Sequence, residues 1–168
     1  RLHWILREGH RFAFQAEVRL WSEMDEASAA RLLAQLGRPR SDGQKEELWR
    51  LRQVRANARG IREVNFDAWD FVRAAMLIRA GLSLGWLSDA EATDTLNLVS
   101  AELRHTYTGW EELGDHFLRA HWYWNGNSGL ESQQEDAHYA SRQAALLDPQ
   151  LGPWSHVPWD SPIPDSRV

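Results

Sequence analysis

Three segments of this sequence open with Ser or Thr and carry Glu three residues later. They begin at Ser88, Thr108 and Ser132. In this pattern the hydroxyl and the carboxylate each accept a hydrogen bond from a backbone amide of the first helical turn, so the pattern is typical of helix starts. We therefore predict three helices from these positions, and we expect the last to run to about Leu147, before Asp148-Pro149.

Apolar residues recur at helical spacing in the earlier part of the chain as well. The first helix is predicted over residues 2–20. A cap at Ser22-Glu-Met-Asp25 then opens a helix through Leu36, and Ser41-Asp-Gly43 precedes a helix over roughly 44–58. A central helix follows over 66–83 and closes around Gly85.

No segment of the sequence alternates apolar and polar residues in the manner of a strand. The pattern predicts an all-α fold, a single compact helical bundle of about six to seven helices over residues 1–147. A tail over 148–168 contains Trp154 and Trp159 among five prolines, and prolines at this density exclude a helix. We expect an extended strap whose tryptophans fill grooves on the bundle. The alternative is a Pro-rich arm offered to another protein.

Tryptophan is unusually abundant, with ten copies, and we expect most of them in the core. The chain contains no cysteine, which excludes disulfides and favours a cytoplasmic location. No apolar run approaches the length needed to span a membrane. Because the chain begins at Arg1 rather than methionine, we expect it to be part of a longer protein.

Charge is unevenly distributed along the chain. Residues 1–62 carry 13 basic and 8 acidic side chains, whereas residues 63–168 carry 6 basic and 16 acidic ones. The basic excess includes four arginines spaced by 3, 4 and 3 residues, which would share one helix face: Arg52, Arg55, Arg59 and Arg62. We favour a solvated face, or one paired with the acidic half. Nucleic-acid binding through this stripe is a minority alternative, because no nucleic-acid motif accompanies it.

Motifs for metal binding or catalysis are missing from the sequence. The seven histidines include no pair at a spacing of three or four residues, and there is no H-E-x-x-H. There is also no G-x-S-x-G motif and no glycine-rich phosphate loop. We expect no metal and no cofactor, and we favour a binding role over an enzymatic one.

The most unusual polar residues lie in Asn65-Phe-Asp-Ala-Trp-Asp-Phe-Val-Arg73, at the start of an otherwise apolar central helix. Burying ionisable groups is costly unless they are paired. Asp67 can cap this helix, and Asp70 can pair with Arg73 at a spacing of three residues. The alternative is a polar cleft in which Asp70, Arg73 and His121 converge as acid–base and anion-binding groups. The wider set of candidate binding residues adds His10, Arg11, Arg79, Trp110 and Trp124.

The order of several short motifs resembles the bacterial family known as domain of unknown function 1266. The motifs are Glu8-Gly-His-Arg11 with Phe14, Ala68-Trp-Asp-x-x-Arg73, Arg79-Ala-Gly81, Gly85-Trp-Leu-Ser88-x-x-Glu91-Ala92, Gly109-Trp-Glu-Glu-Leu-Gly114 and Trp122-Tyr-Trp-Asn-Gly126. The resemblance covers about residues 1–126 and implies an all-helical bacterial domain. Ala120 and His121 stand where the family pattern has a Gly-Arg pair.

These observations favour an accessory domain that binds another protein, and the acidic C-terminal half of the chain favours a basic partner. An immunity or secretion-associated factor in competition between bacteria is the setting that we expect. An enzyme or toxin domain around Asp70, Arg73 and His121 is the competing hypothesis. The sequence does not indicate an oligomeric state.

Overall fold

A computed structural model describes residues 2–39, 41–126 and 129–163 of the chain. The elements are α1 (Leu2–Arg7), α2 (Arg11–Glu23), α3 (Glu26–Leu36), α4 (Asp42–Arg55), the 3₁₀ helix η1 (Ala58–Glu63), α5 (Asp67–Ser83), α6 (Asp89–Thr106), α7 (Trp110–Asn125), α8 (Leu130–Leu146) and α9 (Pro153–His156). Within these ranges every regular element is a helix, so the predicted all-α class is confirmed.

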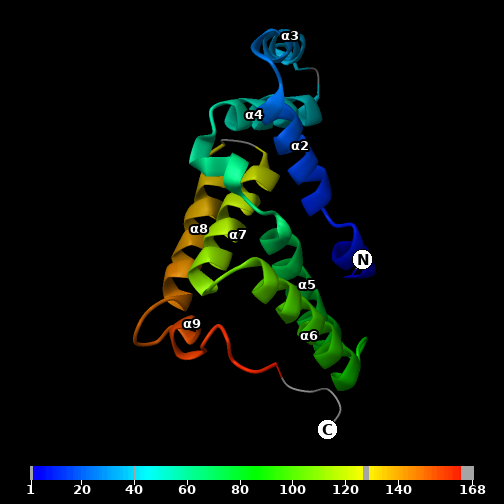
Figure 1. The fold of residues 1–168 in the computed structure, drawn as a ribbon, viewed down its shortest axis with the longest axis vertical. Helices are drawn as coiled ribbons and strands as arrows, with labels where there is room; N and C mark the ends of the chain where they lie inside the picture. The colour runs from blue at the N-terminus through cyan, green and yellow to red at the C-terminus, as the bar shows by residue number, and fades with distance from the viewer. Residues whose placement is uncertain (1, 40, 127–128, 164–168) are drawn as a thin grey trace.

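The long helices form two neighbouring pairs (Figure 1). α5 and α6 lie side by side as a hairpin, and α7 and α8 form a second pair that contacts it through α7. α3 and α4 lie at one end of the molecule, and the turn between α5 and α6 lies at the other. None of the described helices covers the far end of the α5–α6 hairpin.

Three apolar clusters hold the helices together, and two of them are the larger ones. The largest joins α2, α4, the start of α5 and α7, and its most deeply buried members include Leu51, Phe66 and Tyr123. The second lies between α1, α5 and α6 and includes Ile5 and Ile78. α5 contributes to both of these clusters, so it is the central helix of the fold, as its apolar sequence predicts.

The helix predicted over residues 2–20 is in fact two helices, α1 and α2. The chain turns at Gly9, whose φ of +58° is a backbone conformation that side-chain-bearing residues rarely adopt. Asp70 of α5 then accepts a hydrogen bond from the backbone amide of Arg11, at 2.7 Å, and so supplies the cap of α2 from a distant part of the chain. The apolar spacing continues across this break, so the sequence pattern did not predict the break.

The three predicted capping boxes have different outcomes. The box at Ser88 is present, with both Ser88 and Glu91 bonded to backbone amides at the start of α6. α7 begins one residue later than expected, and Thr108 donates its backbone amide and its hydroxyl to Glu112 rather than to Glu111. The prediction of a capping box at Ser132 is wrong, because α8 already begins at Leu130.

Two helix starts therefore lie elsewhere than predicted. α8 begins at Leu130 after Gly129, so Ser132 is a buried residue inside the helix. α3 has Asp25 as its N-cap, and Asp25 accepts the backbone amide of Ser28. Ser22, the other candidate cap, lies within α2. In both cases several capping residues lie close together, and packing decides between them.

The C-terminal tail packs against the bundle over its described part, which ends at residue 163. Trp154 stacks on Trp110 of α7, with ring centroids 5.3 Å apart, and Trp159 meets the same ring edge-on. Trp159 also donates its indole N–H to the carbonyl of Tyr107. The prediction that the tail contains no helix is wrong, because Pro153–His156 forms a short one. A proline is compatible with the first turn of a helix. Pro164, the last proline predicted in the strap, lies outside the described residues.

Gly9→Ala is expected to destabilise the fold by about 2–4 kcal/mol. A Cβ at Gly9 would collide with the Asp70 carboxylate, and the positive φ adds backbone strain. Gly85→Ala is the matched control, because Gly85 has a φ of +69° but no atom within 4 Å of a Cβ. We expect the control to lose about 1 kcal/mol. Chemical denaturation of both variants measures the difference, and equal losses would contradict the proposed close approach of Gly9 to Asp70.

Candidate functional site

Asp70 and Arg11 form a buried polar clasp that joins three helices. Asp70 is completely buried, and Arg11 is 7% exposed. The Arg11 guanidinium donates to the carbonyls of Ile5 and Leu6 at the end of α1, at 2.5 and 2.8 Å. It also lies 3.7 Å from the Asp70 carboxylate, which accepts the Arg11 amide. The pair therefore satisfies the end of α1 and the start of α2 at once.

Asp67 belongs to the same cluster, but it does not cap α5 as predicted. Its carboxylate lies 3.3 Å from Nε of Arg11. The first turn of α5 is satisfied instead by Asn65, whose side chain accepts the Asp67 amide, and by Tyr107, whose hydroxyl accepts the Ala68 amide. Burial raises the pKa of Asp67, and Arg11 opposes that rise.

Arg73 lies beside this clasp without completing it. Its Nη1 atom is 3.9 Å from Oδ1 of Asp70, and neither of these two atoms has a hydrogen-bond partner among the described residues. The guanidinium instead lies over the Trp69 ring, at 5.1 Å from its centroid. Burial raises the pKa of Asp70, while the Arg11 amide and the charges of Arg11, His10 and Arg73 lower it. The predicted Asp70–Arg73 pair is thus weaker than the Asp70–Arg11 pair.

A shallow hollow of about 410 Å³ lies above Arg73, between α1 and α5. His10 and Trp4 line it together with two apolar residues of α5, Met76 and Leu77. Burial lowers the pKa of His10, although the nearby Asp70 charge raises it. The hollow therefore has an apolar wall and one partly exposed guanidinium, and no carboxylate lines it.

His121 lies in an aromatic environment apart from this cluster. Its ring contacts Trp69 and Tyr139, with centroids 5.3 and 4.3 Å away, and Trp124 at 6.0 Å. The carboxylate nearest to its ring is that of Asp136 of α8, at 3.7 Å from Nδ1. Burial lowers the pKa of His121, and the Asp136 and Glu135 charges oppose this.

The proposed triad of Asp70, Arg73 and His121 does not converge on one cavity. Asp70 is sealed in the core, and the contacts of His121 lead to α8 rather than to Asp70. Trp69 contacts both the Arg73 guanidinium and the His121 ring. The geometry therefore gives Asp70 a structural role, with no reacting atom able to approach it.

The remaining candidate residues are widely separated. Trp110 packs against Trp154 and Trp159 of the tail and donates its indole N–H to the Val157 carbonyl, at 2.7 Å. Trp124 is 40% exposed and rests on Trp69. Arg79 lines a groove between α5, α7 and α8.

The four-arginine stripe does not form one helical face. α4 ends at Arg55, and the chain enters a left-handed turn at Asn57 and Arg59, so the later arginines leave the helix line. Arg55 donates to the carbonyls of Trp21 and Met24, and Arg62 donates to those of Val54 and Arg55. Arg59 pairs with Asp136 of the acidic half, at 3.1 Å. Of these four arginines, only Arg52 is exposed without such a contact to another described residue.

Neither metal-site nor membrane-spanning geometry occurs in the part of the chain that the structure describes. Over these residues, no three His, Asp or Glu side chains come together to form a candidate metal site. None of the described helices combines the length and the apolar character needed to cross a bilayer.

The largest group of exposed apolar residues in the described part of the chain was not predicted from the sequence. Five of the twelve large apolar residues that the structure shows as exposed lie within residues 76–86, on the last turns of α5 and in the turn to α6. We call them the hairpin patch: Met76, Leu77, Leu82, Leu84 and Trp86. The one available signal was an apolar run, Leu82-Ser-Leu-Gly-Trp86-Leu87, placed at the predicted end of a helix rather than inside it.

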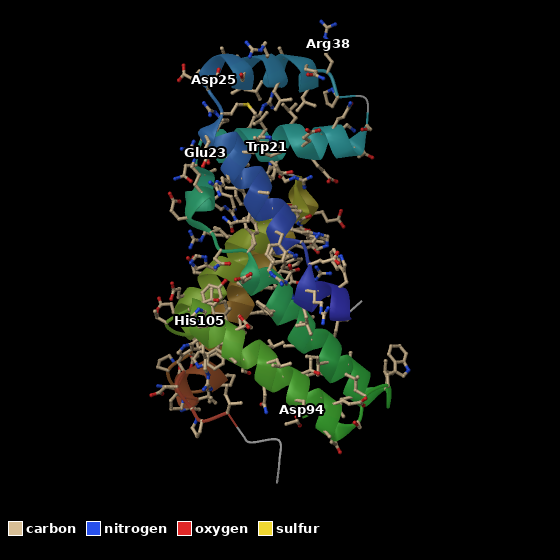
Figure 2. The ribbon with its side chains drawn as sticks, turned by 45° about the vertical axis from the view of Figure 1, so that its right-hand side comes forward. Trp21, Glu23, Asp25, Arg38, Asp94 and His105 are labelled. Atoms are coloured by element: carbon tan, nitrogen blue, oxygen red, sulfur yellow. The ribbon has the colours of Figure 1, made fainter. Side chains whose placement is uncertain are left out.

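Asp70→Ala is expected to lower the free energy of unfolding by about 3 kcal/mol, because it removes the acceptor that caps α2 and one of the two carboxylates beside the buried Arg11 guanidinium. Arg73→Met is expected to cost less than about 1 kcal/mol, since Arg73 is partly exposed and has no hydrogen bond to Asp70. Urea denaturation measures both. Asp94→Ala, on the exposed face of α6 near the hairpin end, is the control (Figure 2). Equal losses for Asp70→Ala and Arg73→Met would contradict the structural assignment.

The pH dependence of stability tests the burial of His121. Burial holds the pKa of His121 below the ordinary value of 6.5. Near and just below pH 6.5, His121 therefore binds a proton more readily in the unfolded chain than in the folded one. Stability should therefore decrease as the pH falls below about 6.5, and His121→Phe should reduce that decrease. His105→Phe is the control, because His105 is exposed at the end of α6 (Figure 2). If His121→Phe and the control show the same pH profile, the assignment fails.

Comparisons with known proteins identify a family but no activity. No curated protein and no solved structure matches the chain. The sequence profile of the family described as "Protein of unknown function (DUF1266)" matches residues 1–159. This match confirms the resemblance carried by the motifs around Arg11 and Asp70 and extends it beyond residue 126 into the tail. Since it covers nearly the whole chain, the protein belongs to the DUF1266 family.

Proposed function

We propose that this protein is a binding domain for another protein and that the hairpin patch is its contact surface. The observation that carries the proposal is the concentration of exposed apolar side chains on one projecting hairpin. Trp86 is 78% exposed and Leu84 is 60% exposed. Clustered apolar residues on a protein surface are typical of interaction sites, and tryptophan is prominent among residues that dominate binding energy.

The turn that presents Trp86 is held in a defined conformation. The amide of Gly85 donates to the carbonyl of Leu82, and the amide of Trp86 donates to that of Gly81, which is a Schellman ending of α5. Such endings commonly bury the side chain that follows the glycine. Here Leu87 packs against Gly81 instead, and Trp86 points away from that contact. A preorganised apolar side chain loses little conformational entropy on binding.

The charges beside the patch favour a basic partner. Residues 80–103 contain four acidic side chains and no basic one. Asp89, Glu91 and Asp94 are exposed at the start of α6, directly after Trp86. Hydrogen bonds from Ser88 lower the pKa of Glu91, which keeps that carboxylate ionised. Apolar contact flanked by carboxylates suits a partner with an apolar pocket and lysine or arginine at its rim.

The setting that we propose is a bacterial accessory role, such as an immunity or secretion-associated factor located in the cytoplasm. A domain that acts by binding needs a shaped surface and no reacting groups. The hairpin patch would supply the surface. Asp70 and His121, the candidate reacting groups, are buried.

The direct test is the stoichiometry of a purified complex. The protein should co-purify with a basic partner, and the variant Trp86→Ala combined with Leu84→Ser should weaken that complex by at least about 100-fold, because the hairpin patch would supply the central contact. Leu151→Ser is the matched control, since Leu151 is 87% exposed on the tail, away from the hairpin. Calorimetry or surface plasmon resonance measures the affinities.

Two results would overturn the proposal. One is a partner whose affinity is the same for the hairpin variant and for the Leu151→Ser control. The other is a complex that tightens as the salt concentration rises, because attraction between the α6 carboxylates and a basic partner should weaken in salt.

A further inference from the structure

A second surface feature lies beside the hairpin patch and shares Met76 with it. It is a groove of about 370 Å³ between α5, α7 and α8, and the tail closes one side of it through Trp154. Its apolar lining includes Val72, Phe117 and Leu146. The three helices and the tail come from distant parts of the sequence, so the groove exists only in the folded chain.

The groove is shaped by a close approach of α8 to α7. The amide of Gln143 lies so near Gly114 that a Cβ there would be 2.5 Å from Nε2. Gly114 is buried and has no side chain, so the amide of Gln143 can rest on the backbone of α7. The result is a narrow apolar slot with one amide in its lining.

Two arginines stand at this groove, and no carboxylate lines it. Arg79 comes from α5 and Arg142 from α8, and both are exposed. Neither guanidinium has a hydrogen bond or an ion pair with any of the described residues, in contrast to Arg11, Arg55, Arg59 and Arg62. In a chain with a net charge of −5, these two guanidinium groups give the apolar slot a local positive charge. They attract an anionic group to the slot.

We propose that this groove binds a small apolar carboxylate, of the size of a medium-chain fatty acid. The apolar chain would lie along Val72, Phe117 and Leu146, and the carboxylate would lie between Arg79 and Arg142. The groove, at about 370 Å³, has room for a chain of the length of decanoate.

The test uses the whole 168-residue chain and two probes of equal chain length and opposite charge. Isothermal titration with sodium decanoate should show one site, whereas decyltrimethylammonium should not bind. Arg79→Ala and Arg142→Ala should each weaken decanoate binding about tenfold, as expected for the loss of one charge-assisted contact. Arg38→Ala is the control, because Arg38 is exposed at the opposite end of the molecule (Figure 2).

The variant Trp86→Ala separates this inference from the proposed function. It should weaken protein binding and leave decanoate binding unchanged, because Trp86 does not line the groove. The inference is overturned if decanoate gives no binding up to about 1 mM, an affinity that corresponds to only about 4 kcal/mol. It is also overturned if the cationic probe binds equally well, or if the double variant Arg79→Ala, Arg142→Ala binds decanoate as the wild type does.

Discussion

The hydrogen bond from the Arg11 amide to the Asp70 carboxylate is the contact on which the rest of the fold depends. It sets where α2 begins, while the Arg11 side chain closes the end of α1. Both helices are thereby fixed to α5, the helix that takes part in both of the larger apolar clusters. Gly9 is required because the carboxylate occupies the space of a side chain. The most polar part of the central helix is therefore a structural joint.

This joint determines what remains for function. With Asp70 enclosed and Arg73 turned onto Trp69, the first half of α5 is committed to the interior. Its second half leaves the bundle beside α6 and carries the hairpin patch into solvent (Figure 1). One helix thus anchors the fold at its start and presents an apolar turn at its end. The groove beside Arg79 lies along the same helix and shares Met76 with the hairpin patch.

The sequence predicted the local features of this structure well and the distant contacts poorly. Apolar spacing and the Ser88 capping box are local signals, and they located α5, its ending at Gly85 and the start of α6. The break at Gly9 was missed because its cause, the Asp70 carboxylate, lies about sixty residues away. Asp70 and Arg73 were recognised as a costly pair to bury, but Arg11 proved to be the closer partner. The exposure of Trp86 could not be predicted, since Leu87 takes the buried position beside it.

A double-mutant cycle between Arg11 and Asp70 tests the central claim most directly. The free energies of unfolding of Arg11→Met, Asp70→Asn and the double variant would be compared with that of the wild type. A structural clasp predicts that the sum of the two single losses exceeds the loss of the double variant by at least about 1 kcal/mol, because the Arg11 guanidinium and the Asp70 carboxylate, 3.7 Å apart, offset each other's charge in the core. Losses that add within about 0.3 kcal/mol would show two independent residues and would contradict the account.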